Sequence, residues 1–378
     1  MPSRYRHKRF SFLNVFAYSF LFLLLACLLR PGPGQAAPPI PEHGFLETSS
    51  AILYDLDHDA ILFEQNADQR IAPASLTKVL SMFLALDSVD QGKLSLDNTV
   101  TVSRAAAGTG GSRMGLREND VVSLEHLLMG MAVSSGNDAS MAVAECVGGS
   151  TPAFVAMMNA KAQALGMRDS QFRNPHGLPA KGQYTTARDM LTLARAYLQA
   201  HPQALRFHNT HTISHKGRVT WNKNPLLGQY PGADGLKTGW VNASGYNLIF
   251  TASQGPRRLL AVILGAPDSR TRGVEAFRLL DAGFQVCGNN AASVVAALDC
   301  LPPERYNPDM RKTAREARRM YAGSDAAPRK NVSKAKAGKA PQAKQTAKAK
   351  PKKKEAHKAA RQKRDSGQAA RSGSGRAG

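Results

Sequence analysis

A serine and a lysine three residues apart form the first candidate catalytic pair. Ser75 and Lys78 follow Pro73, and the apolar series after them predicts a buried helix that begins at Ser75. Residues three apart share one face of a helix, so the Lys78 amine can reach the Ser75 hydroxyl. A desolvated amine loses its proton readily and can act as the base that turns an alcohol into a nucleophile. The pair therefore predicts nucleophilic catalysis.

Ser135-Gly-Asn137 forms a second motif, in a turn between two predicted helices at 124–133 and 138–147. A hydroxyl and a carboxamide at positions i and i+2 can point into one cleft, the first as a proton relay and the second as a ligand for a substrate amide. The alternative interpretation is that the motif only caps the helix that starts at Asp138.

Lys237-Thr238-Gly239 forms the third motif, ahead of a strand predicted from Tyr246. A cation and a hydroxyl at a strand edge would bind a carboxylate, and the glycine would let the substrate approach the backbone. Alone, the tripeptide would usually be a turn. The three motifs are 60 and 102 residues apart and fall in order on helix, turn and strand, which favours a joint function.

Together the motifs resemble the signature of class A β-lactamases and penicillin-binding proteins. The sequence is most similar to low-molecular-mass penicillin-binding proteins that are serine-type D-alanyl-D-alanine carboxypeptidases. The resemblance runs from about 51 to 284 and includes Ser134-Ser-Gly-Asn-Asp-Ala, Asn174-Pro-His-Gly-Leu, Thr185-Thr-Ala-Arg-Asp-Met, Asp234-Gly-Leu-Lys-Thr-Gly and Gly245-Tyr-Asn-Leu. It implies an α/β (α+β) serine β-lactamase/transpeptidase-like fold, in which helices cover an antiparallel sheet and a cleft lies at the sheet edge.

The resemblance also implies catalytic roles for four residues. Ser75 resembles the acylated serine and Lys78 its general base, while Ser135 resembles the proton relay and Asn137 the ligand of the substrate amide. The implied substrates are peptidoglycan stem peptides, from which the enzyme removes the terminal D-alanine. β-Lactams are implied as covalent inhibitors, and no cofactor or metal is implied.

Further residues are implied to bind the substrate. Lys237, Thr238 and Gly239 match the carboxylate-binding side of the family cleft, and the backbone amides of Ser75 and Trp240 match its oxyanion hole. Arg272 falls where the family has an arginine for the terminal carboxylate, although Arg270 is close enough to be confused with it. His176 is expected to fix a loop, because the nucleophile already has a lysine base.

Other functions remain open from the sequence. A class A β-lactamase needs a glutamate between the second and third motifs, and the sequence has none between Glu145 and Glu275. A DD-endopeptidase would use the same residues as a carboxypeptidase. A non-enzymatic wall-binding protein on this fold would not need the nucleophile–base pair.

The N-terminus predicts export. Basic residues at 4–9 precede an apolar run at 12–29, and small residues follow at Gly34 and Ala36, so residues 1–36 are expected to be a cleaved signal peptide. The alternatives are an uncleaved anchor and a lipoprotein signal that ends at residue 26, before Cys27. All three place the body outside the cytoplasm, in the periplasm or on the outer face of the cytoplasmic membrane.

We expect a linker at 37–44, a catalytic domain at 45–288, a second linker at 289–302 and a disordered basic tail at 303–378. Within the domain the patterns predict a hairpin over 50–63, helices at 75–86, 124–133, 138–147, 152–165, 186–200 and 272–284, and strands at 246–252 and 259–264. Strands at both ends of a helical middle predict a sheet that pairs the two ends.

The net charge of +22 belongs to the ends of the chain. Residues 1–30 carry five basic residues and no acid, residues 31–300 carry 22 basic and 22 acidic residues, and residues 301–378 carry 23 and 6. This excludes a basic nucleic-acid-binding domain, and export makes nucleic acid an unexpected partner of the tail. The tail is expected to bind anionic membrane lipids or acidic envelope polymers, or to be a solvated spacer.

The four cysteines give little information. Cys146 is expected to be a small core residue, and Cys287 and Cys300 could form a disulfide in an oxidising compartment. Their spacing resembles no metal site.

Overall fold

A five-stranded antiparallel sheet forms the centre of the computed structural model, which describes residues 46–307. The strand order is β2-β1-β9-β8-β7. These strands are β1 (Ser50–Asp55), β2 (Ala60–Gln65), β7 (Ala233–Val241), β8 (Gly245–Gln254) and β9 (Arg257–Ala266). Because β1 pairs with β9, with Ser50 opposite Leu264, the sheet joins the two ends of the domain, as the sequence predicts.

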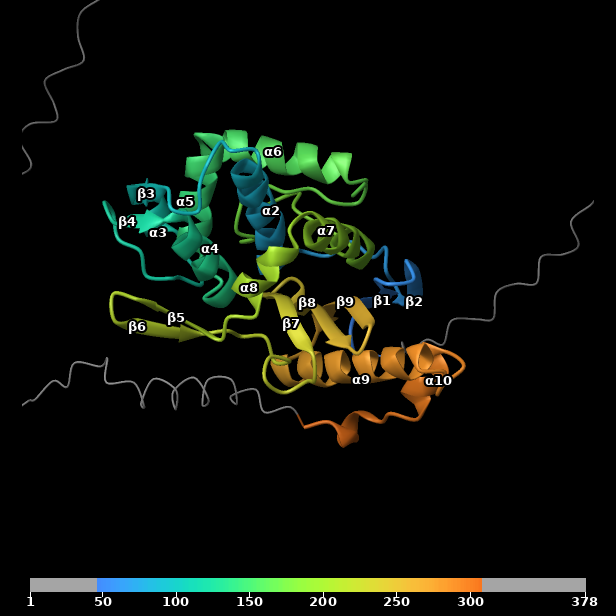
Figure 1. Ribbon diagram of the computed structural model, residues 1–378. Coiled ribbons are helices and arrows are strands. Elements are labelled where there is room, and N and C mark those ends of the chain that lie inside the picture. Colours follow the sequence, from blue (N-terminus) through green and yellow to red (C-terminus); the bar gives the residue numbers. More distant parts are fainter. Residues whose placement is uncertain (1–45, 308–378) are drawn as a thin grey trace, which may run out of the picture. The chain divides into compact units, whose positions relative to one another are not determined.

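A layer of helices covers one face of the sheet, and α9, against which α10 packs, covers the other (Figure 1). The larger layer contains η1 (Ala74–Leu76), α2 (Thr77–Asp90), α3 (Arg104–Gly108), α4 (Leu124–Val133), α5 (Asn137–Gly148), α6 (Thr151–Ala164), α7 (Ala187–Ala200), η2 (Pro202–Ala204) and α8 (Leu205–His208). It also carries two small hairpins, β3 (Thr99–Thr101) with β4 (Val121–Ser123) and β5 (Thr212–His215) with β6 (Arg218–Trp221). Below the sheet lie α9 (Ser269–Cys287) and α10 (Val294–Asp299), followed by η3 (Pro303–Arg305).

Both faces of the sheet are buried, which explains the continuous apolar sequence of β9. Successive side chains of a strand point to opposite faces. Leu260, Val262 and Leu264 belong to the core under the large helical layer, whereas Leu259 and Ile263 belong to the core against α9. The antiparallel sheet is therefore the middle of three layers.

Helix α2 lies in the interior of the large helical layer. Every side chain from Leu76 to Leu86 is at most 6% exposed. A helix that is apolar on all sides is stable only when it is surrounded by other elements. The packing around α2 therefore fixes the position of its N-terminal end, where Ser75 and Lys78 lie.

Most of the long elements agree with the sequence predictions. No bounds were predicted for β7, the strand that carries the third motif, and the other differences lie in short or peripheral segments. The helix predicted over 124–133 is α4, and the predicted hairpin over 50–63 is β1 and β2. The β3–β4 and β5–β6 hairpins were not predicted. Their strands have only three or four residues, which is too few to show an alternation of apolar and polar side chains.

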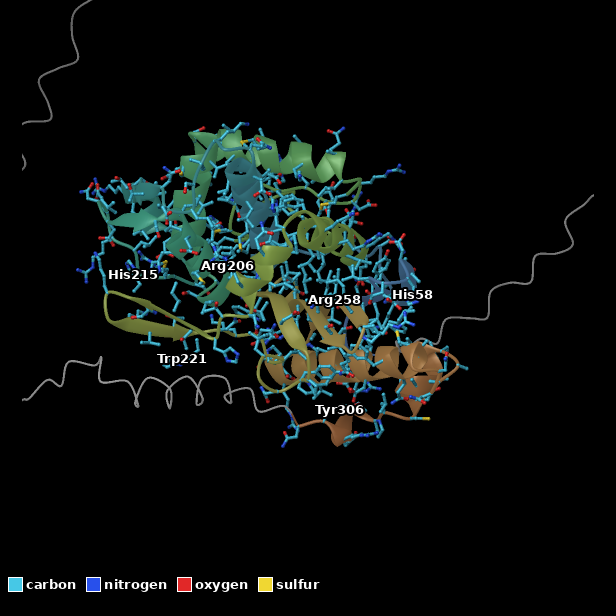
Figure 2. All side chains as sticks on the ribbon, viewed as in Figure 1. His58, Arg206, His215, Trp221, Arg258 and Tyr306 are labelled. Atoms are coloured by element: carbon cyan, nitrogen blue, oxygen red, sulfur yellow. The ribbon has the colours of Figure 1, made fainter. Side chains whose placement is uncertain are left out.

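The segment 289–302, expected to be a linker, is instead partly helical and packed. Helix α10 lies against α9, and Leu298 and Leu301 are at most 2% exposed. Farther along, the Tyr306 hydroxyl donates a 2.7 Å hydrogen bond to Asp281 of α9 (Figure 2). The packed unit therefore continues past residue 288, because these apolar side chains cover the outer face of α9.

The expected signal peptide 1–36, the linker 37–44 and residues 308–378 of the tail lie outside the described residues. Within residues 46–307, no single helix is long and apolar enough to span a membrane; α5 and α6 together reach that length, but they bend by 85° at the break between them.

The three cysteines of the described chain carry free thiols. Cys287 and Cys300 are not bonded to each other, and the Cys287 thiol donates to Asp55 at 3.6 Å. Cys146 is half-buried at the margin of the main core, so the expectation of a core residue holds only in part.

Replacement of Leu298 by alanine tests whether α10 belongs to the folded unit. We expect Leu298→Ala to reduce the free energy of unfolding by about 2–5 kcal/mol, because it removes a buried side chain and leaves a cavity. The exposed neighbour Asp299 is the control, and Asp299→Ala should change stability by about 0.5 kcal/mol or less. Thermal and denaturant unfolding measure both, and equal stability of the two variants would contradict the packing of α10.

Candidate active site

The first motif brings the serine and lysine side chains into contact. Ser75 lies in η1, immediately before α2, and Lys78 lies in the first turn of α2. The Lys78 Nζ is 3.0 Å from the Ser75 Oγ, as the spacing predicts. Ser75 is partly exposed whereas Lys78 is fully buried, so a substrate can reach the hydroxyl while the amine stays dry.

The Lys78 amine is held by neutral oxygen acceptors. It donates to the Asn137 side-chain oxygen and to the His176 backbone carbonyl, each at 2.7 Å. Burial lowers the pKa of Lys78 to about 7; Asp138 opposes this shift and Lys223 adds to it. A substantial fraction of the amine is therefore neutral near pH 7, as a general base requires.

The second motif forms a tight turn between α4 and α5. Ser135 has a φ of +56°, a conformation that non-glycine residues seldom adopt and that is common at functional sites. Asn137 starts α5 and donates from its side chain to the Gly110 carbonyl at 2.7 Å. The capping alternative is wrong, because Gly136 occupies the N-cap position and no side-chain hydrogen bond caps this helix.

The third motif lies on β7, the edge strand of the sheet. The Lys237 Nζ is 3.1 Å from the Ser135 Oγ and donates to the Thr238 carbonyl at 2.8 Å. A Cβ at Gly239 would lie 3.1 Å from the Ala74 Cβ and 3.2 Å from the Ser75 amide nitrogen. The glycine therefore lets β7 pack directly against the nucleophile, and the three motifs meet in one place.

Four basic side chains, Lys78, Lys223, Lys237 and Arg272, gather around this meeting point. Lys237 is 2% exposed, and its pKa is lowered well below the ordinary lysine value by burial and then by Lys78, Lys223 and Arg272. Burial lowers the pKa of Lys223 as well, with a contribution from Arg272. The cluster makes the site strongly attractive to an anionic substrate group.

Arg272 belongs to the cluster and Arg270 does not. Arg272 is 5% exposed, its guanidinium lies 5.8 Å from the centre of the Tyr246 ring, and burial lowers its pKa to about 10. Its Nε has no hydrogen-bond partner among residues 46–307, so it has a donor to offer a ligand. Arg270, two residues earlier on α9, is exposed. This favours Arg272 over Arg270 as the carboxylate-binding residue expected from the sequence.

Trp240 follows the third motif and lies at the mouth of the site. Its side chain is 52% exposed, and its ring centre is 5.9 Å from that of Tyr246. In the described part of the chain, no group of three or more His, Cys, Asp or Glu side chains could hold a metal ion.

The loop at 174–178 packs against the segment that carries the nucleophile and binds its lysine. The His176 carbonyl accepts from Lys78, and the His176 ring accepts from the Leu178 amide at 3.2 Å. Burial and then Lys78 lower the pKa of His176 to about 4, so its ring is neutral at pH 7. Gly177 has a φ of +85°, and a Cβ there would lie 1.7 Å from the Ala74 carbonyl oxygen. These contacts are consistent with the expected role of His176 in fixing the loop.

Two residues that sequence reasoning did not single out also shape the site. The buried Asp138 carboxylate accepts from the backbone amides of Met114, Gly115 and Leu116 at 2.9–3.0 Å. Lys223 reaches to 3.5 Å from the Ser112 hydroxyl. Asp138 could have been identified from the sequence, because it directly follows the second motif. Lys223 could not, because no spacing or periodicity connects it to the site.

Comparison with known proteins agrees with this geometry. The family model described as D-alanyl-D-alanine carboxypeptidase matches residues 36–268, which include all three motifs. The chain belongs to the D-alanyl-D-alanine carboxypeptidase family. Arg272 lies four residues beyond the match, so the family model does not bear on its assignment.

Individual relatives give the same result. A D-alanyl-D-alanine carboxypeptidase, DacF of Bacillus subtilis, is 36% identical over 243 residues, or 63% of this chain and 62% of the relative. The chain thus spans somewhat less than two thirds of the length of that relative. The structure of penicillin-binding protein 6B from Escherichia coli matches with a TM-score of 0.62 and 36% identity, over 66% of this chain and 80% of that one.

A penicillin-binding protein of Listeria monocytogenes in its ampicillin-bound form matches with a TM-score of 0.59. It is 30% identical, over 63% of this chain and 98% of that one. Together these matches confirm the expected family and fold.

The pKa of Lys78 predicts the pH dependence of acylation. Burial depresses this pKa, so the amine is charged below about pH 7 and neutral above it. We expect the second-order rate constant for acylation by a penicillin to rise with pH and to reach half its plateau near pH 7. Stopped-flow measurements between pH 5 and 9 give the profile. A rate that rises only near pH 10, the range of an exposed lysine, would contradict a buried neutral base.

Substitution of Lys78 by arginine separates charge from basicity. Arginine keeps the positive charge but does not lose its proton in a protein, so Lys78→Arg should reduce penicillin acylation by at least about 100-fold. Lys161→Arg is the matched control, because Lys161 is a partly buried lysine that pairs with Asp87 outside the site. Labelling by a fluorescent penicillin measures both, and near-normal labelling of Lys78→Arg would contradict its role as base.

Proposed function

We propose that this protein is a serine DD-carboxypeptidase that removes the terminal D-alanine from peptidoglycan stem peptides through an acyl-enzyme on Ser75. The observation that carries the proposal is the 3.0 Å approach of the Ser75 hydroxyl to a fully buried Lys78 amine whose pKa is lowered to about 7. This pair has the contact and the protonation state that general-base activation of a serine requires.

Acylation starts when the Ser75 oxygen attacks the carbonyl carbon of the penultimate D-alanine. The Ser75 proton passes to the Lys78 Nζ as the new carbon–oxygen bond forms. The backbone amides of Ser75 and Trp240 stabilise the negative oxygen of the tetrahedral intermediate. The close approach of β7 to η1 at Gly239 supports this arrangement, because it places the two backbone segments side by side.

The cationic cluster recognises the terminal carboxylate and assists departure of D-alanine. Lys237, Thr238 and Arg272 bind the carboxylate, and Asn137 orients the amide that precedes the scissile bond. Ser135, whose Oγ lies 3.1 Å from the Lys237 Nζ, relays the proton that Lys78 took from Ser75 to the nitrogen of the leaving D-alanine as the carbon–nitrogen bond breaks, so that Lys78 is neutral again before deacylation. The contact between Lys237 and Ser135 supports an anion site next to the proton relay.

Deacylation uses the same base. Lys78 takes a proton from water as the water oxygen attacks the ester carbonyl, and the Ser75 oxygen leaves and recovers its proton. Penicillins acylate Ser75 by the same first step, which is supported by the ampicillin-bound form of the Listeria relative.

A β-lactamase activity is the less favoured alternative. The two glutamates on either side of the glutamate-free stretch 146–274 are bound to other side chains. Glu145 accepts from the Ser103 hydroxyl at 3.0 Å, and the fully buried Glu275 pairs with Arg278 at 2.7 Å. Neither contact leads to Ser75. A DD-endopeptidase activity would use the residues already described and differs only in the leaving group.

The proposed setting is the cell envelope, outside the cytoplasm, in the periplasm or on the outer face of the cytoplasmic membrane. Residues 1–36 direct export in this proposal, and the basic tail binds anionic lipids or acidic envelope polymers. The net charge of +17 over residues 301–378 supports such an attraction, which weakens as salt shortens the Debye length.

Replacement of Ser75 tests the proposal directly. Wild-type protein should release D-alanine from a D-alanyl-D-alanine peptide and gain one penicillin mass, and Ser75→Ala should do neither. Ser95→Ala, in a turn after α2, is the control and should behave as wild type. Mass spectrometry locates the adduct and a coupled assay measures D-alanine. An adduct on another residue, or D-alanine release by Ser75→Ala at the wild-type rate, would overturn the assignment.

A further inference from the structure

An open cavity of about 480 Å³, lined by both polar and apolar residues, lies at the end of the central sheet, separate from the cluster of catalytic side chains. One wall is the segment that leads into η1, with Arg70 and Ala72, together with Tyr184. The opposite wall is the turn between β7 and β8, including Ser244 and Gly245. The cavity thus lies between the two chain segments that also carry the nucleophile and the third motif.

The cavity begins a short distance from the nucleophile. Ala72 precedes Ser75 by three residues. Gly245 precedes Asn247 by two residues on β8, and Asn247 pairs with Gly239, which lies against the Ser75 amide. Two residues of a strand span about 7 Å, so the cavity opens about that far from the acylation point along the sheet.

The proposed substrate orientation points the stem peptide toward this cavity. Its terminal carboxylate binds at Lys237 and Thr238, and its scissile carbonyl binds at Ser75 and Trp240. Along β7, the direction from Lys237 to Trp240 continues to Val241 and then to the turn that lines the cavity. An extended peptide therefore reaches the cavity about two residues before the residue that acylates Ser75.

Arg70 gives the cavity its chemical preference. Its guanidinium stacks on the Tyr184 ring at 4.6 Å and donates from two nitrogens to the Asp169 carboxylate, at 2.7 and 3.2 Å. The Arg70 side chain is 57% exposed, so these contacts orient the guanidinium while part of it faces the solvent, and they use only two of its five N–H donors. The remaining donors suit a carboxylate, which an arginine binds with charge-assisted hydrogen bonds.

We propose that this cavity is a subsite for the stem peptide and that Arg70 binds a free carboxylate two residues before the acylating D-alanine. The subsite rests on the proposed carboxypeptidase function and specifies its substrate as an acidic stem peptide. The group that we expect Arg70 to bind is the α-carboxylate of a γ-linked D-glutamyl residue in the stem peptide.

Three peptides and two variants test the subsite. The peptides are L-alanyl-γ-D-glutamyl-L-lysyl-D-alanyl-D-alanine, the same peptide with D-isoglutamine in place of D-glutamate, and diacetyl-L-lysyl-D-alanyl-D-alanine, which ends before the cavity. For wild type we expect kcat/KM to be about tenfold higher with the D-glutamyl peptide than with either other peptide, as for one charge-assisted hydrogen bond. Arg70→Gln should abolish this preference.

Arg195→Gln is the matched control, because Arg195 also stacks on a tyrosine, Tyr54, and pairs with an aspartate, Asp59, away from the cavity. It should keep the wild-type preference. An Arg70→Gln variant with an unchanged preference would overturn the subsite while leaving the proposed function intact. If wild type releases no D-alanine even from the short peptide, the proposed function is wrong and the subsite is wrong with it.

Discussion

The burial of two lysine amines, Lys78 and Lys237, is the constraint on which the rest of the structure depends. Removing an amine from water disfavours its charged form, and two such amines near each other disfavour it further. The protein gives Lys78 neutral acceptors, the Asn137 amide and the His176 carbonyl, in place of a carboxylate in direct contact. A direct ion pair would stabilise the protonated amine and remove the base. The free energy that this arrangement costs is offset by the apolar packing around α2.

The carboxylate of Asp138, which raises the Lys78 pKa, shows how this constraint is met. Asp138 is fully buried and acts on Lys78 electrostatically, but its oxygens accept from the amides of Met114, Gly115 and Leu116. Arg113 also approaches this carboxylate, at 3.7 Å. The negative charge therefore organises a loop and moderates the lysine pKa without neutralising it. One side chain thus contributes both to the shape of the cleft wall and to its electrostatics.

The sequence is sufficient to predict what depends on local geometry. The contact of Ser75 with Lys78 follows from helical spacing, and α4 and the β1–β2 hairpin follow from periodicity. It is not sufficient where packing decides. Lys223 enters the site through a loop after a four-residue strand, and α10 packs because α9 has an apolar outer face that needs a cover. The approach of Ser135 to Lys237, 102 residues apart, could be predicted only through the family resemblance.

The position of β7 at the edge of the sheet has a consequence for how the site changes under selection. An edge strand presents main-chain amides and carbonyls along its outer side, and a peptide or drug that lies along it can pair with them as an added strand. Such recognition depends on hydrogen bonds between the main-chain groups of the strand and those of the ligand. A point mutation alters a side chain and leaves those groups in place. Resistance to an inhibitor bound in this way therefore requires the strand itself to move. That movement would also lower the affinity for the natural peptide.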